Sequence, residues 1–439
     1  MPRIVHLGLG NFHRGHQAVY TQLAGGDWRI TGVARSNRAL VATLRRQEMR
    51  YTVLTIDGDH VDAQRVDVID RALVAADDPA GVTDAIASPE VTVVTLTITE
   101  AGYQDDQPGD RSLLGLLAAG LSRRAGAGGQ PISVVSCDNL TDNGRVLSGV
   151  MRRIAARRED SALADYLDAR VAFPATMVDR IVPATTDRHR ELARRAGYAD
   201  QVPVPAEPFR QWVLDDSFTA ERPPWHEAGA LVTTAVHDWE TIKVRLVNGS
   251  NSMLAYLGLL RGHTLIAAAF ADPVIRAAVD ALGDEYQPTL PAPDGFDARA
   301  YRAALASRFG NAALGHRTDQ VGTDGSLKLR QRVVDTASWY ARRSALPSVL
   351  CLLTAAYLRC LCQPGALAGG PPADPRAAAL AERGRRHPDE HELVRAVLGE
   401  DELFGAVLAA DSAFQERTGD LLRVLARSGP AAAVRALTA

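Results

Sequence analysis

The sequence predicts an α/β protein with an N-terminal doubly wound parallel sheet and a mainly α-helical C-terminal part. Three observations support this prediction. Strand-like runs alternate with helical segments in the first part of the chain, and a Gly-x-Gly turn follows the first run, as in a dinucleotide-binding βαβ unit. Helical segments rich in Ala and Leu follow one another later in the chain. We therefore expect a Rossmann-type dinucleotide-binding domain over residues 1–232 and a helical substrate and catalytic domain over residues 233–439.

The expected strands are short runs rich in β-branched residues, which suit a sheet buried on both faces. They are residues 4–7, 30–34, 51–56, 91–97 and 132–136. Helical periodicity between them predicts helices at residues 11–20, 38–47 and 113–124. Prolines break the pattern over residues 201–224, which we interpret as a connecting region. Later helices are expected at residues 252–260, 275–282, 300–309, 346–361, 377–385 and 390–398.

Composition excludes several classes of function. The 439 residues carry a net charge of −3, so there is no basic field and nucleic acid is not an expected partner. No two of the four cysteines have CxxC spacing, so no metal site is expected. The N-terminus lacks an apolar targeting run, and the apolar stretch at residues 345–362 is interrupted by Arg359 and too short to span a membrane. We expect a cytoplasmic protein without a membrane partner, with this stretch as a buried helix.

The glycine turn over residues 8–13 reads Gly-Leu-Gly-Asn-Phe-His. In a dinucleotide site, Gly8 would allow the tight turn and Gly10 the close approach of a pyrophosphate. His13 occupies the third glycine position, so the fingerprint is incomplete and a plain βα turn is the alternative.

The residues after the second strand normally read the ribose of the cofactor, and NAD sites place an acid there. Here Arg35 and Arg38 flank two small polar residues, and no acid is present. This pattern favours a 2′-phosphate and therefore NADP, while a solvated pair of arginines is the alternative.

Lysine is rare in this chain. Of 49 Lys and Arg residues, only Lys243 and Lys328 are lysines. A coding bias toward Arg would replace lysine wherever either serves, so the two that remain mark positions where Arg does not substitute. A buried lysine can release its proton and act as a general base, whereas Arg stays charged. We interpret Lys243 as that base, with chance retention as the alternative.

A polar helix face accompanies Lys243. At about 100° per residue, Glu240, Asn251 and Asn248 lie about 60°, 80° and 140° from Lys243 on a helical wheel. An amine, a carboxylate and two carboxamides suit a secondary alcohol that becomes a carbonyl, because the amides stabilise the alkoxide-like oxygen while hydride leaves for a nicotinamide. A helix start capped by Asn and Ser side chains is the alternative.

Three other polar residues are candidates. Asn139 follows the strand at residues 132–136, at the sheet edge where ligands bind, and could donate to an oxyanion; capping a loop is the alternative. Arg317 and Lys328 lie in a polar segment between helices and could bind a carboxylate or polyol hydroxyls, with surface solvation as the alternative.

Six motifs, in this order, resemble those of the mannitol dehydrogenase family, the polyol-specific long-chain dehydrogenases that include fructuronate reductases. They are GLGNFHRGHQ at residues 8–17, TITEAGY at 97–103, SCDNL at 136–140, MVDRIVP at 177–183, KVRLVNGSNS at 243–252 and DGSLK at 324–328. The resemblance covers nearly the whole chain.

The resemblance implies a Rossmann domain, a helical domain with the site between the two, and zinc-independent hydride transfer with NAD, without excluding NADP. It also implies that Lys243 is the base and that Asn139 and Asn248 stabilise the oxyanion. Glu240 would relay the proton and Asp179 would bind substrate. We expect the cofactor to contact Gly8, Gly10, Asn11, Phe12, Arg35, Thr97, Thr99 and Glu100.

Two positions depart from the family pattern. Asn251 replaces a histidine that contacts substrate hydroxyls, and Gln320 stands where polyol-oxidising members often carry Arg. Residues 316–320 look closer to the fructuronate reductase branch, in which an anionic substrate would need Arg317 or Lys328. We expect an NAD(P)-dependent dehydrogenase for a polyol or sugar acid, monomeric or a small homo-oligomer. The alternative is a catalytically silent sensor that binds NAD(P) or a sugar acid.

Overall fold

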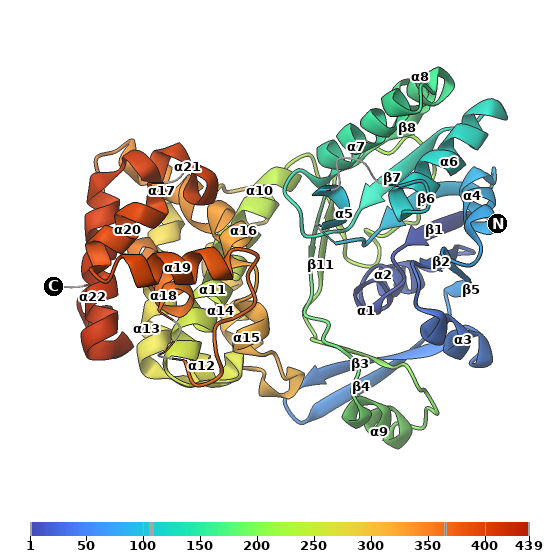
Figure 1. Ribbon diagram of the computed structural model, residues 1–439. Coiled ribbons are helices and arrows are strands. Elements are labelled where there is room, and N and C mark those ends of the chain that lie inside the picture. Colours follow the sequence, from blue (N-terminus) through green and yellow to red (C-terminus); the bar gives the residue numbers. More distant parts are fainter. Residues whose placement is uncertain are drawn as a thin grey trace. The chain divides into compact units, whose positions relative to one another are not determined.

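The computed structural model describes residues 2–99, 101–104, 109–363, 365, 367–399 and 401–437. The chain divides into two units, Met1–Glu240 and Thr241–Ala439, which Figure 1 colours from blue to green and from yellow-green to red. The division falls within helix α10 (Val236–Ile242), slightly later than the boundary expected between residues 232 and 233.

A parallel sheet of six strands forms the centre of the first unit (Figure 1), in the order β5-β2-β1-β6-β7-β8. Every adjacent pair is parallel, which confirms the expected doubly wound sheet. The carboxyl ends of β1, β6 and β7 therefore lie side by side at one edge. The strands are β1 (Arg3–Leu7), β2 (Arg29–Ala34), β5 (Ile69–Val74), β6 (Val91–Leu96), β7 (Ile132–Ser136) and β8 (Val171–Ala172).

Helices pack on the sheet over two separate hydrophobic cores. One core contains residues of α2 and α3, and the other contains residues of α4, α6, α7 and α8. The expected helix over residues 11–20 is two helices, because the backbone at His16 leaves the helical region with φ −129° and ψ −84°. The helices are α1 (Asn11–Gly15), α2 (Gln17–Ala24), α3 (Arg38–Arg46), α4 (Pro79–Ala87), α5 (Ala101–Gln104), α6 (Leu113–Gly126), α7 (Asn143–Arg157), α8 (Ser161–Arg170) and α9 (Asp187–Arg195).

Two small sheets add to the first unit, in the orders β10-β3-β4 and β12-β11-β9. They show that the interpretation of residues 201–224 as a connecting region is wrong, since this stretch contains β10 and β11. Its prolines are tolerated because β10 is an edge strand, and Trp212 anchors the stretch by packing on Trp225 in the core. The strands are β3 (Tyr51–Asp57), β4 (His60–Val66), β9 (Thr176–Asp179), β10 (Val204–Ala206), β11 (Gln211–Leu214) and β12 (Leu231–Val232).

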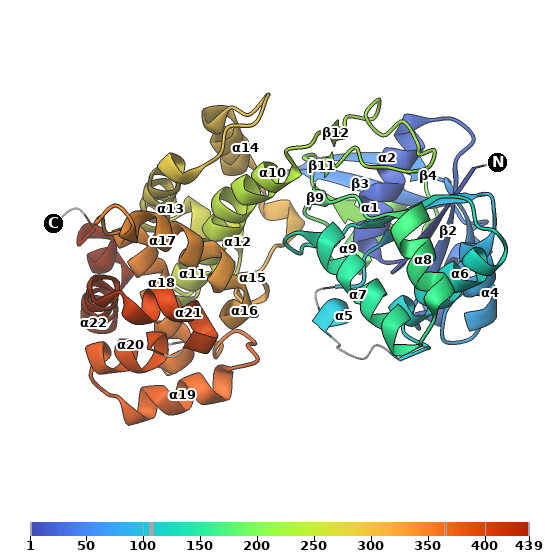
Figure 2. The same cartoon turned by 90° about the horizontal axis from the view of Figure 1, so that it is seen from above.

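The second unit is helical, as expected, and Figure 2 shows its helices from a second direction. Two of its segments, η1 and η4, are π-helical, and η2 and η3 are 3₁₀ turns. The first elements are η1 (Lys243–Gly249), α11 (Ser250–Leu260), α12 (Ile266–Ala271), α13 (Pro273–Tyr286), η2 (Gln287–Thr289), α14 (Ala298–Gly310) and η3 (Ala312–Leu314). The later ones are α15 (Thr318–Val321), α16 (Gly325–Leu329), η4 (Arg330–Val334), α17 (Asp335–Ala341), α18 (Ser348–Cys362), α19 (Ala377–Arg386), α20 (Glu390–Leu398), α21 (Asp401–Ala410) and α22 (Ser412–Arg435).

Helix α18 lies at the centre of this unit and packs against α11, α19 and α22. Nearly all of its side chains are buried, which confirms the expected buried helix within residues 345–362. Among the helices that the structure describes, none has both the length and the apolar character needed to cross a bilayer.

Candidate active site

The chain leaves β1 through Gly8, at a position that only glycine can occupy. Its φ is +108°, and a Cβ there would lie 2.0 Å from the carbonyl oxygen of Thr97. The N–H groups of Gly8 and Leu9 both donate to the carbonyl of Val33 at 2.9 Å, which fixes the turn to β2. The first glycine is therefore required by the fold itself.

The second glycine, Gly10, is not required by packing. A Cβ there would meet only the carbonyl oxygen of Gly8, at an ordinary contact distance of 3.6 Å. The absent side chain leaves open space beside the turn. A pyrophosphate that approaches the backbone closely needs this space, so the turn fits a dinucleotide.

His6, in the middle of β1, connects the glycine turn to β6 and was not predicted as a site residue. Its Nε2 lies 2.9 Å from Thr97 Oγ1 and 3.2 Å from the Gly8 carbonyl, and its Nδ1 lies 2.8 Å from Thr95 Oγ1. Because Thr97 Oγ1 donates to the Gly8 carbonyl at 2.9 Å, it accepts from His6 Nε2–H, and Thr95 then donates to Nδ1. Burial lowers the pKa of His6 to about 3, so the neutral ring holds the turn throughout the physiological pH range. A histidine within an apolar strand was the only signal in the sequence.

The side chains of Asn11 and Phe12 take part in packing inside the first unit. Asn11 Nδ2 donates to the carbonyl of Pro183 at 3.0 Å, and Asn11 Oδ1 accepts from Arg14 at 2.6 Å. Phe12 stacks on His16 with ring centroids 5.1 Å apart. Any contact of these residues with a cofactor would therefore come from the backbone or from the exposed part of the Phe12 ring.

His13, at the position of the third glycine, is fully buried. Its ring stacks on His6 with the centroids 3.4 Å apart and the planes at 11°. The position belongs to the core beneath the turn, which accounts for the incomplete fingerprint.

The segment after β2 offers two exposed arginines, Arg35 and Arg38. Arg38 forms a forked ion pair with Asp77, at 2.5 Å for the shortest contact, and Asn37 caps α3 by accepting from the N–H of Leu40 at 3.0 Å. The side chain of Arg35 is exposed. Both arginines expected to bind a 2′-phosphate are thus accessible from solvent, and Arg38 is already paired with an acid.

The loop after β6 is held by Asp138, another residue that the sequence analysis did not single out. Its carboxylate accepts from the N–H groups of Ile98 at 3.0 Å and Thr99 at 2.8 Å, and from the Tyr103 hydroxyl at 2.7 Å. Desolvation raises the pKa of Asp138 above its usual value. Thr99 has a φ of +68°, which is unusual for a β-branched residue and is common at functional sites. Glu100 lies outside the described residues.

Asn139 and Asp179 lie in the first unit, Asn139 three residues after the carboxyl end of β7 and Asp179 at the end of β9. Asn139 is exposed directly after Asp138, and Asp179 is the buried last residue of β9. Strand β9 is attached to this edge because the Thr176 hydroxyl donates to the carbonyl of Ser136 at 2.6 Å.

The carboxylate of Glu240 is grouped with His237 and Asp142. Its Oε2 accepts from the N–H of Asp142 at 3.4 Å and lies 3.7 Å from His237 Nδ1, which is also 3.8 Å from Asp142 Oδ1. Glu240 is buried, whereas the His237 side chain is 69% exposed. These three side chains present a possible set of ligands for a divalent cation, and they also form a polar route from a buried carboxylate to the surface.

Lys243 begins the π-helical segment η1, which lies between α10 and α11. The predicted angle of about 140° between Lys243 and Asn248 is wrong, because the wheel assumed an α-helix. In a π-helix each N–H bonds to the carbonyl five residues earlier, so residue 248 lies one turn above residue 243. The π turn thus brings the amine and the first carboxamide onto one face.

The side chains on this helix differ in exposure. Lys243 is 8% exposed, and Asn248 and Asn251 are half-buried. The Oδ1 atom of Asn251 is buried and has no hydrogen-bond partner in the described part of the protein. A hydrogen-bond donor on a ligand would satisfy this oxygen.

The two cations expected to bind an anionic substrate have partners within the second unit. Arg317 forms a forked ion pair with Asp319 at 2.9 and 2.8 Å and is about half exposed. Lys328 Nζ donates to the carbonyl of Thr323 at 2.7 Å. Both residues therefore stabilise the segment that contains them.

The structure groups the predicted residues into two sets. The first set lies at the carboxyl edge of the parallel sheet, and the second lies on one helix of the second unit. The first consists of Gly8, Gly10, Thr97, Thr99 and Asn139, and the second of Lys243, Asn248 and Asn251.

The doubly wound sheet with its glycine turn defines a Rossmann-type protein with an additional helical unit. Comparison with known families agrees with this class. The family model for the mannitol dehydrogenase Rossmann domain matches residues 2–227, and the model for the mannitol dehydrogenase C-terminal domain matches residues 235–424. The chain belongs to the mannitol dehydrogenase family.

Curated relatives and solved structures extend this similarity. The chain is 37% identical to the D-mannonate oxidoreductase of Escherichia coli over 81% of this chain and 79% of that protein. It is 35% identical to the mannitol 2-dehydrogenase of Cereibacter sphaeroides over 88% of this chain and 86% of that protein. The structure of Pseudomonas fluorescens mannitol 2-dehydrogenase in a ternary complex with NAD and D-mannitol matches with a TM-score of 0.88 and 32% identity. That match covers 100% of this chain and 94% of the other.

Proposed function

We propose that this protein is a dehydrogenase that oxidises a secondary alcohol of a polyol or sugar acid to the ketone, with NAD as the hydride acceptor. The observation that carries the proposal is the π-helical segment with buried Lys243 and with Asn248 one turn above it. The Gly8–Gly10 turn, with space for a pyrophosphate, supplies the cofactor half.

Each side chain has a separate role in this reaction. Lys243 takes the hydroxyl proton of the substrate, while Asn139 and Asn248 donate N–H groups to the same oxygen as negative charge develops on it. NAD, when bound, accepts the hydride from the carbon that bears this oxygen. Glu240 passes the proton from Lys243 toward water along the route past His237. Because the amides and the amine stabilise the oxygen, the reaction needs no metal ion.

The relatives support both the cofactor and the class of substrate. The Pseudomonas fluorescens enzyme was solved with NAD and D-mannitol, and the Escherichia coli relative is named for D-mannonate. Of the two exposed arginines after β2, Arg38 is already paired with Asp77, and this favours NAD over NADP because a 2′-phosphate would compete with that ion pair.

Nicotinamide absorbance with purified protein tests the proposal. One panel contains the neutral polyols mannitol, arabinitol, sorbitol and xylitol, and the other contains aldonates such as mannonate, with the matching ketoses and keto-uronates for reduction. We expect turnover with NAD on at least one panel, faster than with NADP and unchanged after treatment with a metal chelator. Cofactor binding without turnover on either panel in either direction would contradict the proposal and favour a silent sensor.

A further inference from the structure

Gly249, the last residue of η1, packs directly against Tyr286 at the end of α13. A Cβ on Gly249 would lie 2.6 Å from the Tyr286 hydroxyl and 2.8 Å from its ring. Tyr286 is fully buried. The ring therefore rests on the bare backbone of the π turn, in a contact that any larger residue at 249 would prevent.

The hydroxyl of Tyr286 also contacts the second π-helical segment, η4. It donates to the carbonyl of Arg332, within η4, at 2.7 Å. Arg332 in turn donates from Nη1 to Ser252 Oγ at 2.6 Å, and Ser252 lies in α11 just after the π turn. Tyr286 thus connects the two π-helical segments, and the connection returns to the helix that carries Lys243.

The 3₁₀ turn η2, which follows Tyr286, also contacts η1 near the beginning of η1. The guanidinium of Arg245 donates to the carbonyl of Thr289, and the Thr289 hydroxyl donates to the carbonyl of Tyr286 at 2.6 Å. Arg245 is half-buried at this contact, and desolvation lowers the pKa of its guanidinium. The segment from Tyr286 to Thr289 therefore contacts η1 at positions 245 and 249.

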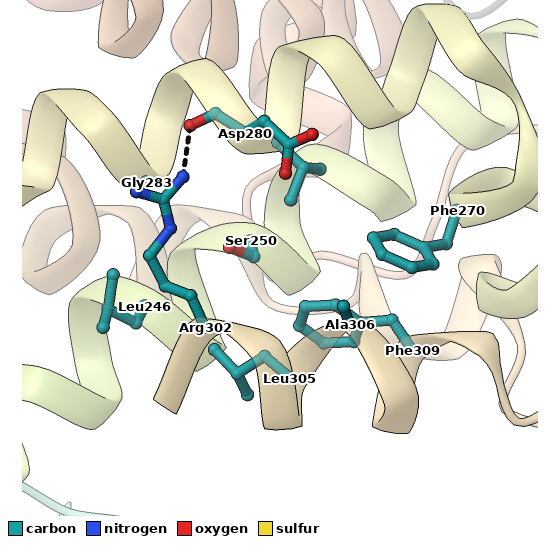
Figure 3. A pocket seen from close by; sticks show the side chains of 10 residues that line it. Leu246, Ser250, Phe270, Asp280, Gly283, Arg302, Leu305, Ala306 and Phe309 are labelled. Carbon is teal, nitrogen blue, oxygen red and sulfur yellow. Dashed lines mark hydrogen bonds between the residues drawn. The ribbon is translucent and has the colours of Figure 1, made fainter. Parts of the chain in front are cut away.

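Another side of η1 borders a small cavity. Leu246 and Ser250 line a cavity of about 30 Å³ between this helix, α13 and α14 (Figure 3). Arg302 lies over the cavity and donates to the carbonyl of Asp280 at 2.9 Å. The cavity has room for about one water molecule and is too small for a polyol.

We propose that Tyr286 is a positioning residue that holds residues 243–249 in the π-helical register. π-Helical turns are rare and short, so this one depends on tertiary contacts. If the contact is lost, the segment relaxes toward α-helical geometry, and Asn248 turns away from Lys243. The inference rests on the proposed function for its catalytic consequence, but the register itself can be measured independently of activity.

The two lysines of the chain provide such a measurement. Reductive methylation with ¹³C labels the amines of Lys243 and Lys328 together with the N-terminal amine, and the Lys243→Ala and Lys328→Arg variants assign the two lysine signals. We expect Tyr286→Phe to change the chemical shift and the titration midpoint of Lys243 and to leave Lys328 unchanged. The matched control is Tyr340→Phe, because Tyr340 also donates to a backbone carbonyl of this unit, that of Glu285 at 2.8 Å, and the described residues include no hydrogen bond from Tyr340 to η1.

Kinetics on the best substrate of the panels provide the second measurement. Tyr286→Phe should lower kcat by about 10- to 100-fold, as expected for a misplaced catalytic group, with the Kd for NAD within about twofold of wild type. In a Lys243→Ala background the same change should have no further effect on kcat. Thr289→Val removes the hydrogen bond to the Tyr286 carbonyl and should also lower kcat. This variant replaces Tyr286→Phe if Tyr286→Phe does not fold.

The outcomes separate the two proposals. Lysine signals and kcat that are the same in Tyr286→Phe, Thr289→Val and Tyr340→Phe would overturn the positioning role, even if Lys243→Ala is inactive. An altered Lys243 signal in a protein whose Lys243→Ala variant keeps full activity would overturn the proposed function and leave the positioning of the π turn intact.

Discussion

At the scale of single residues, the two glycines of the first turn have different physical roles. Gly8 is fixed by the fold, because it has a positive φ and its hydrogen atom faces the carbonyl of Thr97. Gly10 has neither constraint, and its missing side chain matters only to a molecule placed beside the turn. The Gly-x-Gly pattern alone does not separate these roles, because both positions read as glycine.

Alanine at position 8 should therefore reduce stability, whereas alanine at position 10 should reduce cofactor binding. Gly8→Ala should destabilise the protein by about 2 kcal/mol or more, from overpacking and the positive φ together. Gly10→Ala should unfold at nearly the wild-type temperature but lose the stabilisation that saturating NAD gives the native state. Thermal unfolding with and without NAD measures both effects. A Gly10→Ala protein that NAD still stabilises as in wild type would contradict the cofactor site proposed here.

At the scale of elements, near-continuous runs of β-branched residues predicted four strands of the parallel sheet, because such a sheet is buried on both faces. The strand at residues 204–206 escaped prediction because it contains Pro205, and the strand at residues 211–214 escaped because it lies in a proline-broken stretch and the burial of Trp212 depends on distant residues. The π turn escaped for a similar reason. A π turn contains one residue more than an α-helical turn, which hardly changes the apolar pattern of the sequence. The contact of this turn with Tyr286 is formed only in the folded chain.

Candidate site residues were predictable to different degrees. Lys243 and the glycine turn were accessible because the chemistry restricts the residue type at those positions. His6 and Asp138 were not, since they act by holding the backbone of neighbouring loops. Arg317 was selected for its charge alone, and only the structure reveals its ion pair with Asp319.

Helix α18 has a pH-dependent contact at its first turn. The Glu285 carboxylate accepts from the N–H groups of Val349 at 3.0 Å and Leu350 at 2.8 Å. Desolvation raises the pKa of Glu285 from 4.5 to about 7. Between these two pH values the folded protein keeps a proton that the unfolded chain releases, so this group's contribution to stability is lost as the pH rises through this range.

The Glu285→Gln variant should lack this dependence. Between pH 5 and pH 8, the free energy of unfolding should fall by on the order of 2 kcal/mol more in wild type than in the variant. This figure uses about 1.4 kcal/mol per unit of pKa shift and is reduced because the carboxyl group is partly exposed. Urea unfolding at the two pH values measures this difference, and Glu227→Gln, at an exposed position, is the control. Equal pH dependence in wild type and Glu285→Gln would show that this carboxyl group is not protonated in the folded state.

At the scale of the whole molecule, family similarity extends over both units, since the two family models together reach from residue 2 to residue 424. The first unit carries the cofactor turn and Asn139, and the second carries Lys243 and Asn248. The proposed reaction therefore needs both units. Asn251, which departs from the family pattern, lies in the second unit as well, and its Oδ1 atom has no hydrogen-bond partner in the described part of the protein.

Lys243→Ala tests most directly whether Lys243 is the base of a nicotinamide-dependent dehydrogenase. The measurement is single-turnover reduction of NAD by the best substrate of the panels, together with the Kd for NAD in the same protein. We predict that the rate falls by at least about 100-fold, as for the loss of a general base, while NAD binds as in wild type. A variant that binds NAD and still turns over at close to the wild-type rate would contradict the account.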